Sequence, residues 1–252
     1  MTIHEQLVTL CRDLGNPQRD LAILGEGNAS ARLDDETFVV TTSGSELLRV
    51  TENELVDVTL SQAASLARDG AEEFDREALN ALALHGPKGE RRVPSIETLL
   101  HALVLERTGC NFVGHTHPTA ILGLVCTERG VDSLSAPLFP DEVVVCGPRA
   151  LVVPYAAPGP ALASTLDHAL VTHFDEVGSW PKTIMLINHG LLALGETPAE
   201  VMAVTTMAEK AARVRLHSLS IGEIRPLTSE QIRSLDTRSD EEFRRRKLIE
   251  GA

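Results

Sequence analysis

Aromatic residues are scarce in this sequence, at 3% of 252 residues. Proteins that bind single-stranded nucleic acid stack bases on aromatic side chains, so a protein of that class is not expected. Positive charge is also in deficit: the formal net charge is −13 at pH 7. Such a chain repels nucleic acid and anionic membranes. The expected partner is a small molecule, and backbone N–H groups can still hold an anionic one.

Long apolar runs and paired cysteines are lacking as well. No stretch approaches the roughly 18–20 apolar residues of a membrane-spanning helix, and the first ten residues lack a signal-peptide pattern. The four cysteines show no CxxC spacing. Buried free thiols in a reducing compartment explain them best. We therefore expect a soluble cytoplasmic protein.

Hydrophobic periodicity predicts both helices and strands. Helices are expected over Ile3–Leu14, Ile96–Arg107, Pro118–Arg129, Leu162–His173 and Pro198–Leu219. Strands are expected at Ala31–Leu33, Phe38–Thr42, Glu54–Leu60, Val143–Cys146, Leu151–Val153 and Thr183–Ile187, the last continued by Leu191–Leu194. Clustered strands with flanking helices predict one layered α/β or α+β domain over residues 1–252.

Two segments look peripheral. Ser61–Arg92 is polar, alanine-rich and acidic, and is interpreted as a surface excursion with some helix that could cover a substrate pocket. The chain is charge-dense from about residue 236, which predicts a solvated tail.

Two histidines separated by one residue, His115 and His117, are the most informative pattern. Strand side chains alternate between faces, so both imidazoles point to one side if Asn111–Gly114 begins a strand, and Pro118 keeps His117 extended. His189, in an Asn-His-Gly turn, is placed to supply a third imidazole. Its alternative role is a strand end whose ring bonds a carbonyl. Three imidazoles with an open position are typical of a catalytic Zn²⁺ site.

Glu97 is the candidate catalytic carboxylate. Ser95 is expected to cap the helix that follows, which places Glu97 in the first turn, shortly before the histidine strand. A carboxylate there could alternate between a metal and a proton, or could merely interact with the helix dipole. His101, one turn further on, could bond Glu97, but a structural role is favoured.

Small residues in three turns predict an anion site. Gly27–Ser30, Thr42–Gly44 and Ser95 offer hydroxyls, an amide and free backbone N–H groups, from which phosphate cradles are built. Each is common in ordinary turns, so none is specific by itself. Gly25-Glu26-Gly27 is not a dinucleotide fingerprint, because no third glycine follows at the required spacing.

Other enzymes with a His-x-His pair fit poorly. A metallo-β-lactamase-like site would continue with Asp-His, where this chain has Pro118. A cupin requires a glutamate a few residues later, and the next acidic residue here is Glu128. An amidohydrolase barrel has its pair near the start of a longer chain.

Taken together, the motifs resemble the class II aldolase/adducin-head family, which includes fuculose-phosphate and rhamnulose-phosphate aldolases and ribulose-phosphate 4-epimerase. The matching segments occur in family order at 25–30, 41–44, 94–97, 114–118 and 188–190. The resemblance implies a three-layer αβα sandwich around a mostly antiparallel sheet. It also implies a homotetramer with active sites at subunit interfaces.

The resemblance further implies a Zn²⁺-dependent aldolase that cleaves a small, phosphorylated ketose through a metal-stabilised enediolate, with Mn²⁺ or Co²⁺ as other possible metals. The residues implied for the site are the metal ligands His115, His117 and His189, the catalytic acid/base Glu97, and the substrate-binding Asn28, Ser43, Gly44 and Ser95.

Several departures keep other activities open. The aldolases use tyrosines to protonate the departing aldehyde, and this chain has only Tyr155. Asp141 lies near where the epimerase keeps a base, although glutamate at position 97 favours the aldolase branches. Arg91 or Arg92 could add positive charge near the site. The alternatives are an epimerase, dehydratase or decarboxylase acting on a related sugar phosphate, or a non-catalytic adducin-like domain without metal.

Overall fold

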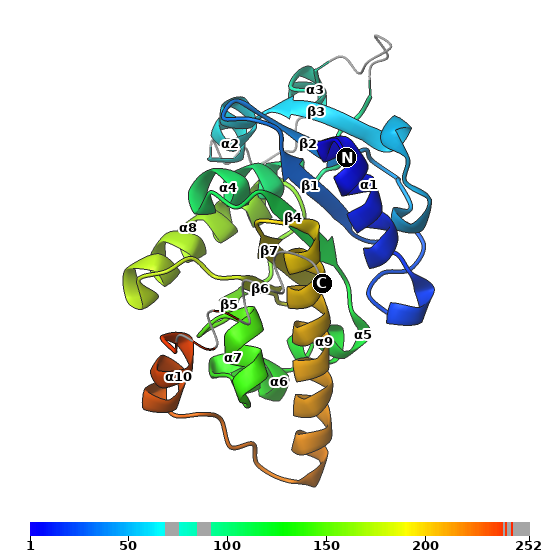
Figure 1. Ribbon diagram of the computed structural model, residues 1–252. Helices are drawn as coiled ribbons and strands as arrows, with labels where there is room; N and C mark the ends of the chain where they lie inside the picture. Colours follow the sequence, from blue (N-terminus) through cyan, green and yellow to red (C-terminus); the bar gives the residue numbers. More distant parts are fainter. Residues whose placement is uncertain (69–75, 85–91, 239, 241–242, 244–252) are drawn as a thin grey trace.

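The computed structural model describes residues 1–68, 76–84, 92–238, 240 and 243. Within this part of the chain, seven strands form one sheet in the order β3-β2-β1-β4-β7-β6-β5 (Figure 1). Only β5 and β6 pair in parallel, and the other neighbours are antiparallel. The strands are β1 Asn28–Arg32, β2 Thr37–Thr41, β3 Leu55–Thr59, β4 Phe112–Thr116, β5 Leu151–Val153, β6 Thr183–Leu186 and β7 Gly190–Gly195.

Helices surround the sheet. The α-helices are α1 Ile3–Leu14, α2 Leu60–Arg68, α3 Arg76–Ala81, α4 Thr98–Thr108, α5 Thr119–Val125, α6 Glu128–Asp132, α7 Pro140–Cys146, α8 Pro160–Val177, α9 Pro198–Ile221 and α10 Ser229–Asp236. Short 3₁₀ turns are η1 Pro17–Arg19, η2 Leu47–Arg49, η3 Glu52–Glu54 and η4 Ser133–Ser135.

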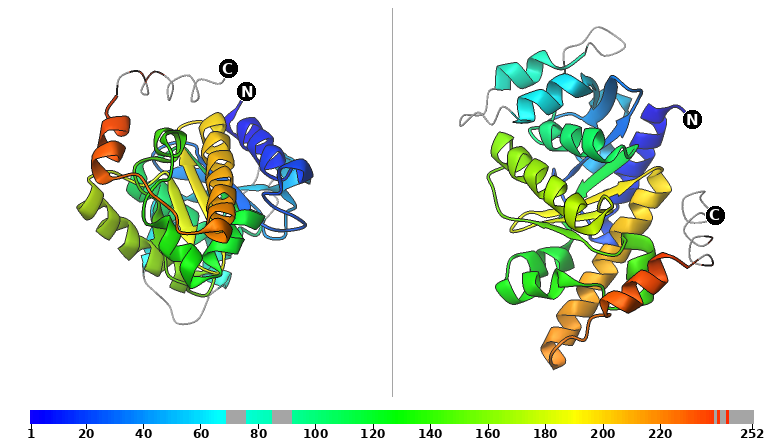
Figure 2. Two further views of the ribbon diagram at one scale, coloured as in Figure 1. Left: turned by 90° about the horizontal axis from the view of Figure 1, so that it is seen from below. Right: turned by 90° about the vertical axis from the view of Figure 1, so that its left-hand side faces the viewer.

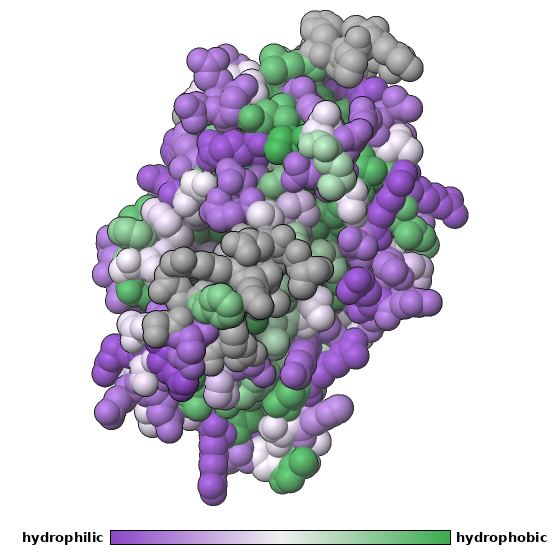
Figure 3. Space-filling model, viewed as in Figure 1, coloured by the Kyte–Doolittle hydropathy of each residue, from purple (hydrophilic) through white to green (hydrophobic). Residues whose placement is uncertain are grey.

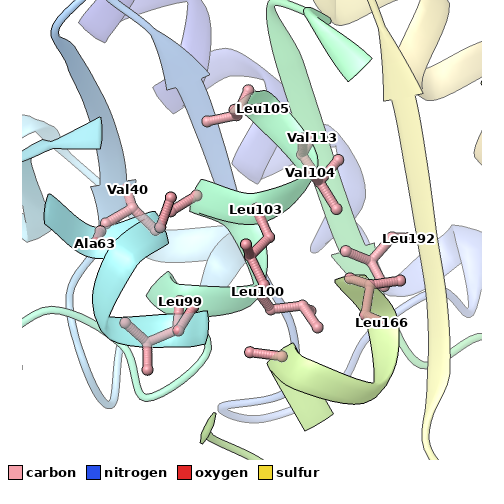
Figure 4. Packing of buried hydrophobic residues seen from close by; sticks show 14 of the residues in the cluster. Val40, Ala63, Leu99, Leu100, Leu103, Val104, Leu105, Val113, Leu166 and Leu192 are labelled. Carbon is pink, nitrogen blue, oxygen red and sulfur yellow. The ribbon is translucent and has the colours of Figure 1, made fainter. Parts of the chain in front are cut away.

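Helices α2, α4 and α8 cover one face of the sheet (Figures 1 and 2). Figure 4 shows Leu99, Leu100 and Leu103 of α4 packed with Leu166 of α8, toward the strands. The residues of helix α4 from Thr98 to Leu105 are all buried, as expected of a helix enclosed between other elements.

Helices α1 and α9 cover the opposite face, with α5 and α7 beside α9. Ala29 of β1 and Val39 of β2 belong to the cluster that packs on α1. The predicted three-layer αβα arrangement around a mostly antiparallel sheet is therefore confirmed. Because β1 residues alternate, Asn28 and Ser30 face the other layer, toward α4.

Local sequence signals explain the helix that was predicted most closely. Helix α1 spans Ile3–Leu14 as expected. Thr2 and Glu5 form a reciprocal capping box at its start, and Gly15 ends it. Leu7, Leu10, Cys11 and Leu14 are buried on one stripe.

The predicted strand Val143–Cys146 is wrong, because these residues lie in helix α7. Its β-branched composition favours a strand. However, Pro140 occupies the first helical turn together with acidic residues, where both are favourable. Burial of Val143 and Val144 beside α9 then outweighs the local strand preference.

Further boundaries differ from expectation. Strand β1 begins at Asn28, within the segment expected to be a turn. Leu191–Leu194 does not continue the preceding strand but returns antiparallel to it, because the chain reverses at Asn188. The helix expected to run to Arg129 breaks after Val125 and restarts at a Thr127 cap. Ser95 is not the cap of α4: Glu97 occupies that position, and the Ser95 hydroxyl accepts a hydrogen bond from the Glu97 N–H.

The surface-excursion interpretation of Ser61–Arg92 is wrong for its first part. Helix α2 packs into the core through Ala63, Ala64 and Ala67, which are fully buried. Small alanines allow α2 to approach α4 closely. Residues 69–75 and 85–91 lie outside the described residues, so covering of the substrate pocket remains a prediction.

The outer surface is mainly hydrophilic on the face shown in Figure 3, with hydrophobic residues in separate groups. Among the described residues, no helix combines the length and apolar character needed to cross a membrane. Helix α10 lies beside α7. Most of the charge-dense tail predicted from about residue 236 lies outside the described residues.

An ion pair connects the helices of the first layer. Arg107 of α4 donates two hydrogen bonds, of 2.7 and 2.8 Å, to Asp167 of α8, and Arg68 of α2 lies 3.7 Å from the same carboxylate. The hydrogen bond from Arg107 holds the pKa of Asp167 below its usual value.

We expect Asp167→Asn to destabilise the protein by about 1–2 kcal/mol at pH 7, because charged hydrogen bonds are lost at a mostly buried position. Because the pKa of Asp167 is lower in the folded protein than in the unfolded chain, ionised Asp167 stabilises the fold at pH values above the unfolded pKa of about 3.9. This stabilisation is lost as the pH falls through the folded-state pKa. The difference between Asp167→Asn and the wild type should therefore shrink below about pH 4. Urea unfolding at several pH values measures it, with Glu176→Gln as the control from the exposed Arg149–Glu176 pair.

Candidate metal and active site

Three imidazoles meet where β4 ends beside the β6–β7 turn. His115 lies on β4 and His117 follows its end. Asn188, with φ of 56°, reverses the chain so that His189 precedes β7, which pairs with β4. The ring centroids lie 4.8, 4.9 and 5.1 Å apart. One nitrogen from each ring lies within 4.8 Å of the other two.

Each ring presents its Nε2 atom to the same space. The Nδ1 of His115 is 3.0 Å from the carbonyl oxygen of Leu191, to which it donates, so its Nε2 keeps a lone pair. The Nε2 of His117 lies 3.0 Å from the Nε2 of His115, and the Nε2 of His189 lies 3.0 Å from Oε1 of Glu97. The Nδ1 of His189 is buried and has no hydrogen-bond partner within the described residues, so the ring does not bond a carbonyl.

Burial favours the neutral form of two of these rings. His115 is fully buried, and desolvation lowers its pKa. Desolvation, together with the neighbouring His115 and His189, lowers the pKa of His117 to about 3. Neutral imidazoles are the form that binds a metal.

This arrangement fits a divalent cation. Three convergent imidazole nitrogens beside a carboxylate are the donor set of catalytic zinc sites. Imidazole and carboxylate also suit Mn²⁺ and Co²⁺. The identity of the metal remains a prediction.

The carboxylate of Glu97 touches this cluster. Its Oε1 is 3.0 Å from His189 Nε2, and its Oε2 is 3.4 Å from His115 Nε2. The side-chain amide of Asn28 donates to Oε2 at 2.5 Å. Burial by itself would raise the pKa of Glu97, but these contacts outweigh burial and hold the pKa well below its usual range. Glu97 is therefore a carboxylate anion at neutral pH.

The predicted substrate-binding residues separate into two groups. Asn28 and Ser95 are buried beside Glu97, and the side-chain amide nitrogen of Asn28 lies 3.4 Å from the Ser95 hydroxyl oxygen. Ser43 and Gly44 lie in an exposed turn. The Ser43 N–H donates to the carbonyl of Val93, which ties this turn to the segment before Ser95 and α4. The structure thus brings Asn28 and Ser95 to Glu97, and the role of all four residues toward a substrate remains a prediction.

Other residues considered from the sequence lie in different surroundings. Asp141 borders a groove between α7 and α9 that Met202, Met207 and Lys210 also line. Arg92 donates to the carbonyls of Glu52 and Leu55, both at 2.7 Å, which gives it a structural role. Arg91 lies outside the described residues. Tyr155 follows the edge strand β5 and is 61% exposed.

Sequence reasoning missed the partners that hold Asn28. The His101 ring does not bond the Glu97 carboxylate directly; its Nε2 lies 2.5 Å from the Asn28 side-chain carbonyl oxygen, and its Nδ1 lies 2.7 Å from the Ser30 hydroxyl. The available signal was the spacing: Ser30 follows Asn28 by one strand period, and His101 follows Glu97 by one helical turn.

Gly27 gives a direct test of the backbone beneath the site. Its φ is +74°, and a Cβ added there would lie 2.5 Å from the carbonyl oxygen of His115. Gly27→Ala should lower stability by about 1–3 kcal/mol through left-handed strain and reduce the metal bound per subunit. Gly25→Ala is the matched control, since a Cβ at Gly25 meets nothing within 4 Å. Urea unfolding and elemental analysis measure both effects, and equal behaviour of the two variants would contradict the prediction.

Comparison with known proteins identifies the family of this chain. A family model described as "Class II Aldolase and Adducin N-terminal domain" matches residues 5–216. The chain belongs to this family. The match includes every residue of the three-imidazole cluster and Glu97, and it confirms the resemblance inferred from the motifs.

Two curated proteins are similar to this chain over most of their lengths. One, from Haemophilus influenzae, is a 3-oxo-tetronate 4-phosphate decarboxylase that is 27% identical over 225 residues, 88% of this chain and 90% of its own. A protein of the same name from Pectobacterium atrosepticum is 28% identical over 221 residues, 86% of each chain. Among solved structures, an L-fuculose 1-phosphate aldolase has a TM-score of 0.70 and 19% identity, covering 96% of both chains. This last likeness shows the common fold.

Proposed function

We propose that this protein is a divalent-metal-dependent lyase acting on a small, phosphorylated sugar derivative. The carbon–carbon bond that it breaks joins the first and second carbons beyond the carbonyl group. The observation that carries this proposal is the contact of the ionised Glu97 carboxylate with a cluster of three imidazoles. A metal held by His115, His117 and His189 would supply positive charge beside the carbonyl oxygen of the substrate. The family membership supports the same class of chemistry.

Glu97 is the group that would move a proton. Breaking the bond leaves an electron pair on the carbon beside the carbonyl, and that carbon must then receive a proton. A carboxyl group in hydrogen-bond contact with the cluster can take a proton and deliver it there. Asn28 and His189 orient the two carboxylate oxygens toward the position where the carbon is expected to bind.

Among reactions of this class, we favour decarboxylation of a 3-oxo sugar acid phosphate. Carbon dioxide leaves from the acid, and one proton is added to the carbon that carried it. One carboxyl group can perform that transfer. The names of the two curated relatives support this choice.

Aldol cleavage of a ketose phosphate is the second candidate, and it was the leading prediction from the sequence. Its support is the common fold with a fuculose-phosphate aldolase. It also requires a proton to leave the hydroxyl group that becomes the aldehyde. The chain's one tyrosine, the group that the resemblance implies for this proton, is 61% exposed. Decarboxylation does not need such a group.

The two candidates differ in their second product. We expect the metal-loaded protein to convert 3-oxo-tetronate 4-phosphate to carbon dioxide and dihydroxyacetone phosphate, followed by ¹³C NMR. A panel of ketose phosphates tests aldol cleavage, which would release an aldehyde with the ketone phosphate. The unphosphorylated 3-oxo acid is the control for the phosphate requirement. If the purified protein contained no metal and formed no product from any of these substrates, the non-catalytic alternative would be favoured instead.

We also propose a homotetramer and a cytoplasmic location, as the resemblance and composition imply. Light scattering after gel filtration measures the mass of the assembly against 27.2 kDa for one chain. A monomer at micromolar concentration would contradict the tetramer.

A further inference from the structure

Four buried polar side chains form a continuous line from the core to Glu97. The Ser30 hydroxyl lies 2.7 Å from His101 Nδ1, His101 Nε2 lies 2.5 Å from Asn28 Oδ1, and Asn28 Nδ2 lies 2.5 Å from Glu97 Oε2. Ser30 and His101 are 0% exposed, Asn28 5% and Glu97 7%. Polar groups buried to this degree are costly unless each has a partner. The line is therefore a specific arrangement of four side chains that must stay together.

Matching periodicities of a strand and a helix bring these residues into contact. Asn28 and Ser30 are two apart on β1, so both side chains face α4. Glu97 and His101 are four apart at the start of α4, so both lie on one side of the helix. Two residues of strand and one turn of helix cover similar lengths, roughly 6.6 and 5.4 Å. His101 can thus reach both strand residues while Glu97 reaches Asn28.

Hydrogen-bonding capacity gives this line one direction. The amide nitrogen of Asn28 lies against the Glu97 carboxylate, to which it donates, and the amide carbonyl faces His101. His101 must then carry its hydrogen on Nε2 to donate to that carbonyl. Its Nδ1 is left as an acceptor for the Ser30 hydroxyl. Burial lowers the pKa of His101 to about 3, which agrees with a neutral ring.

We propose that His101 is a positioning residue that acts on Glu97 through Asn28, an inference that rests on the proposed lyase function of Glu97. The ring holds the Asn28 amide so that its NH₂ group faces the carboxylate. If the amide turned over, its carbonyl oxygen would face Glu97 and repel it. His101 thus fixes where the Glu97 carboxylate lies relative to the three imidazoles without touching substrate or metal.

Two substitutions of His101 separate this role from general support of the core. In His101→Gln, the side-chain NH₂ can occupy the place of Nε2 and still donate to Asn28. In His101→Asn, the shorter amide matches Nδ1 and reaches only Ser30. We expect His101→Gln to retain most of the wild-type kcat and His101→Asn to lose about 10- to 100-fold, the usual effect of removing an outer partner of a site. KM and bound metal should change little in either.

A double-mutant cycle tests whether the effect passes through Asn28. If it does, His101→Asn should lower kcat in the wild-type background but add little to Asn28→Ala. Equal losses in both backgrounds would show that the two residues act independently and would overturn the proposal. So would equal kcat values for His101→Gln and His101→Asn.

Matched controls come from His173, another buried histidine on a helix, outside the site. His173→Gln and His173→Asn repeat the same chemical changes and should alter stability without a difference in kcat. If either control reproduces the kcat pattern of position 101, the effect is one of core packing, and the proposal fails.

Nitrogen NMR of ¹⁵N-histidine-labelled protein gives a readout that does not depend on turnover. His101 is expected as the neutral Nε2–H form near pH 7, and Ser30→Ala should shift its Nδ1 signal. An Nδ1–H form would overturn the arrangement even if the enzyme is active. An inactive wild type with the expected Nε2–H form would instead remove the lyase proposal, leaving a structural line of side chains.

Discussion

Glu97→Gln is expected to lower kcat by about 10²- to 10⁴-fold, the usual contribution of a positioned acid or base. Glutamine keeps the shape of the side chain and can still contact Asn28, but it cannot carry a proton between solvent and substrate. The variant should remain folded, and its bound metal should stay near the wild-type level, because three imidazoles remain. Kinetics with the active substrate, together with elemental analysis, measure both.

Glu26→Gln is the matched control for that substitution. The Oε1 atom of Glu26 lies 4.0 Å from His117 Nδ1, and the Glu26 side chain is 36% exposed. The same loss of charge there should affect kcat far less than at Glu97. Full turnover by Glu97→Gln, or equal losses in the two variants, would rule out the role given to Glu97.

His189→Ala should weaken metal binding by at least about 100-fold, since even outer partners of metal ligands contribute up to that much. This residue lies far from His115 and His117 in the sequence, and its loss leaves two donors. Chelator competition with Zn²⁺, Mn²⁺ and Co²⁺ measures the affinity of each metal. His217→Ala, at an exposed position on α9, is the control.

Turnover should depend on the bound metal in the same way. Dialysis against a chelator is expected to remove activity from the wild type, and adding back the native metal should restore it. Unchanged metal affinity in His189→Ala would show that this ring is not a ligand, and the site would then have to be assigned to other groups.

Much of the fold could be predicted because its signals are local. The stripe of apolar residues in α1 and the capping pair Thr2 and Glu5 lie within a few residues of one another. The His115 and His117 pair likewise needs only strand alternation to face one way. Helix α7 shows the opposite case: its valines favour a strand locally, and packing beside α9, together with the helix-favouring first turn at Pro140, reverses that preference.

The sequence by itself determined the family and the candidate side chains for the chemistry, because the histidine, glutamate and small-residue motifs are short and readable in isolation. Only the tertiary structure decided how they are used. Asn28, assigned to substrate from its motif, has its amide hydrogen-bonded to Glu97 and His101, 69 and 73 residues away in the chain. Such partnerships depend on β1 and α4 packing face to face, and no local periodicity encodes which strand a helix will cover.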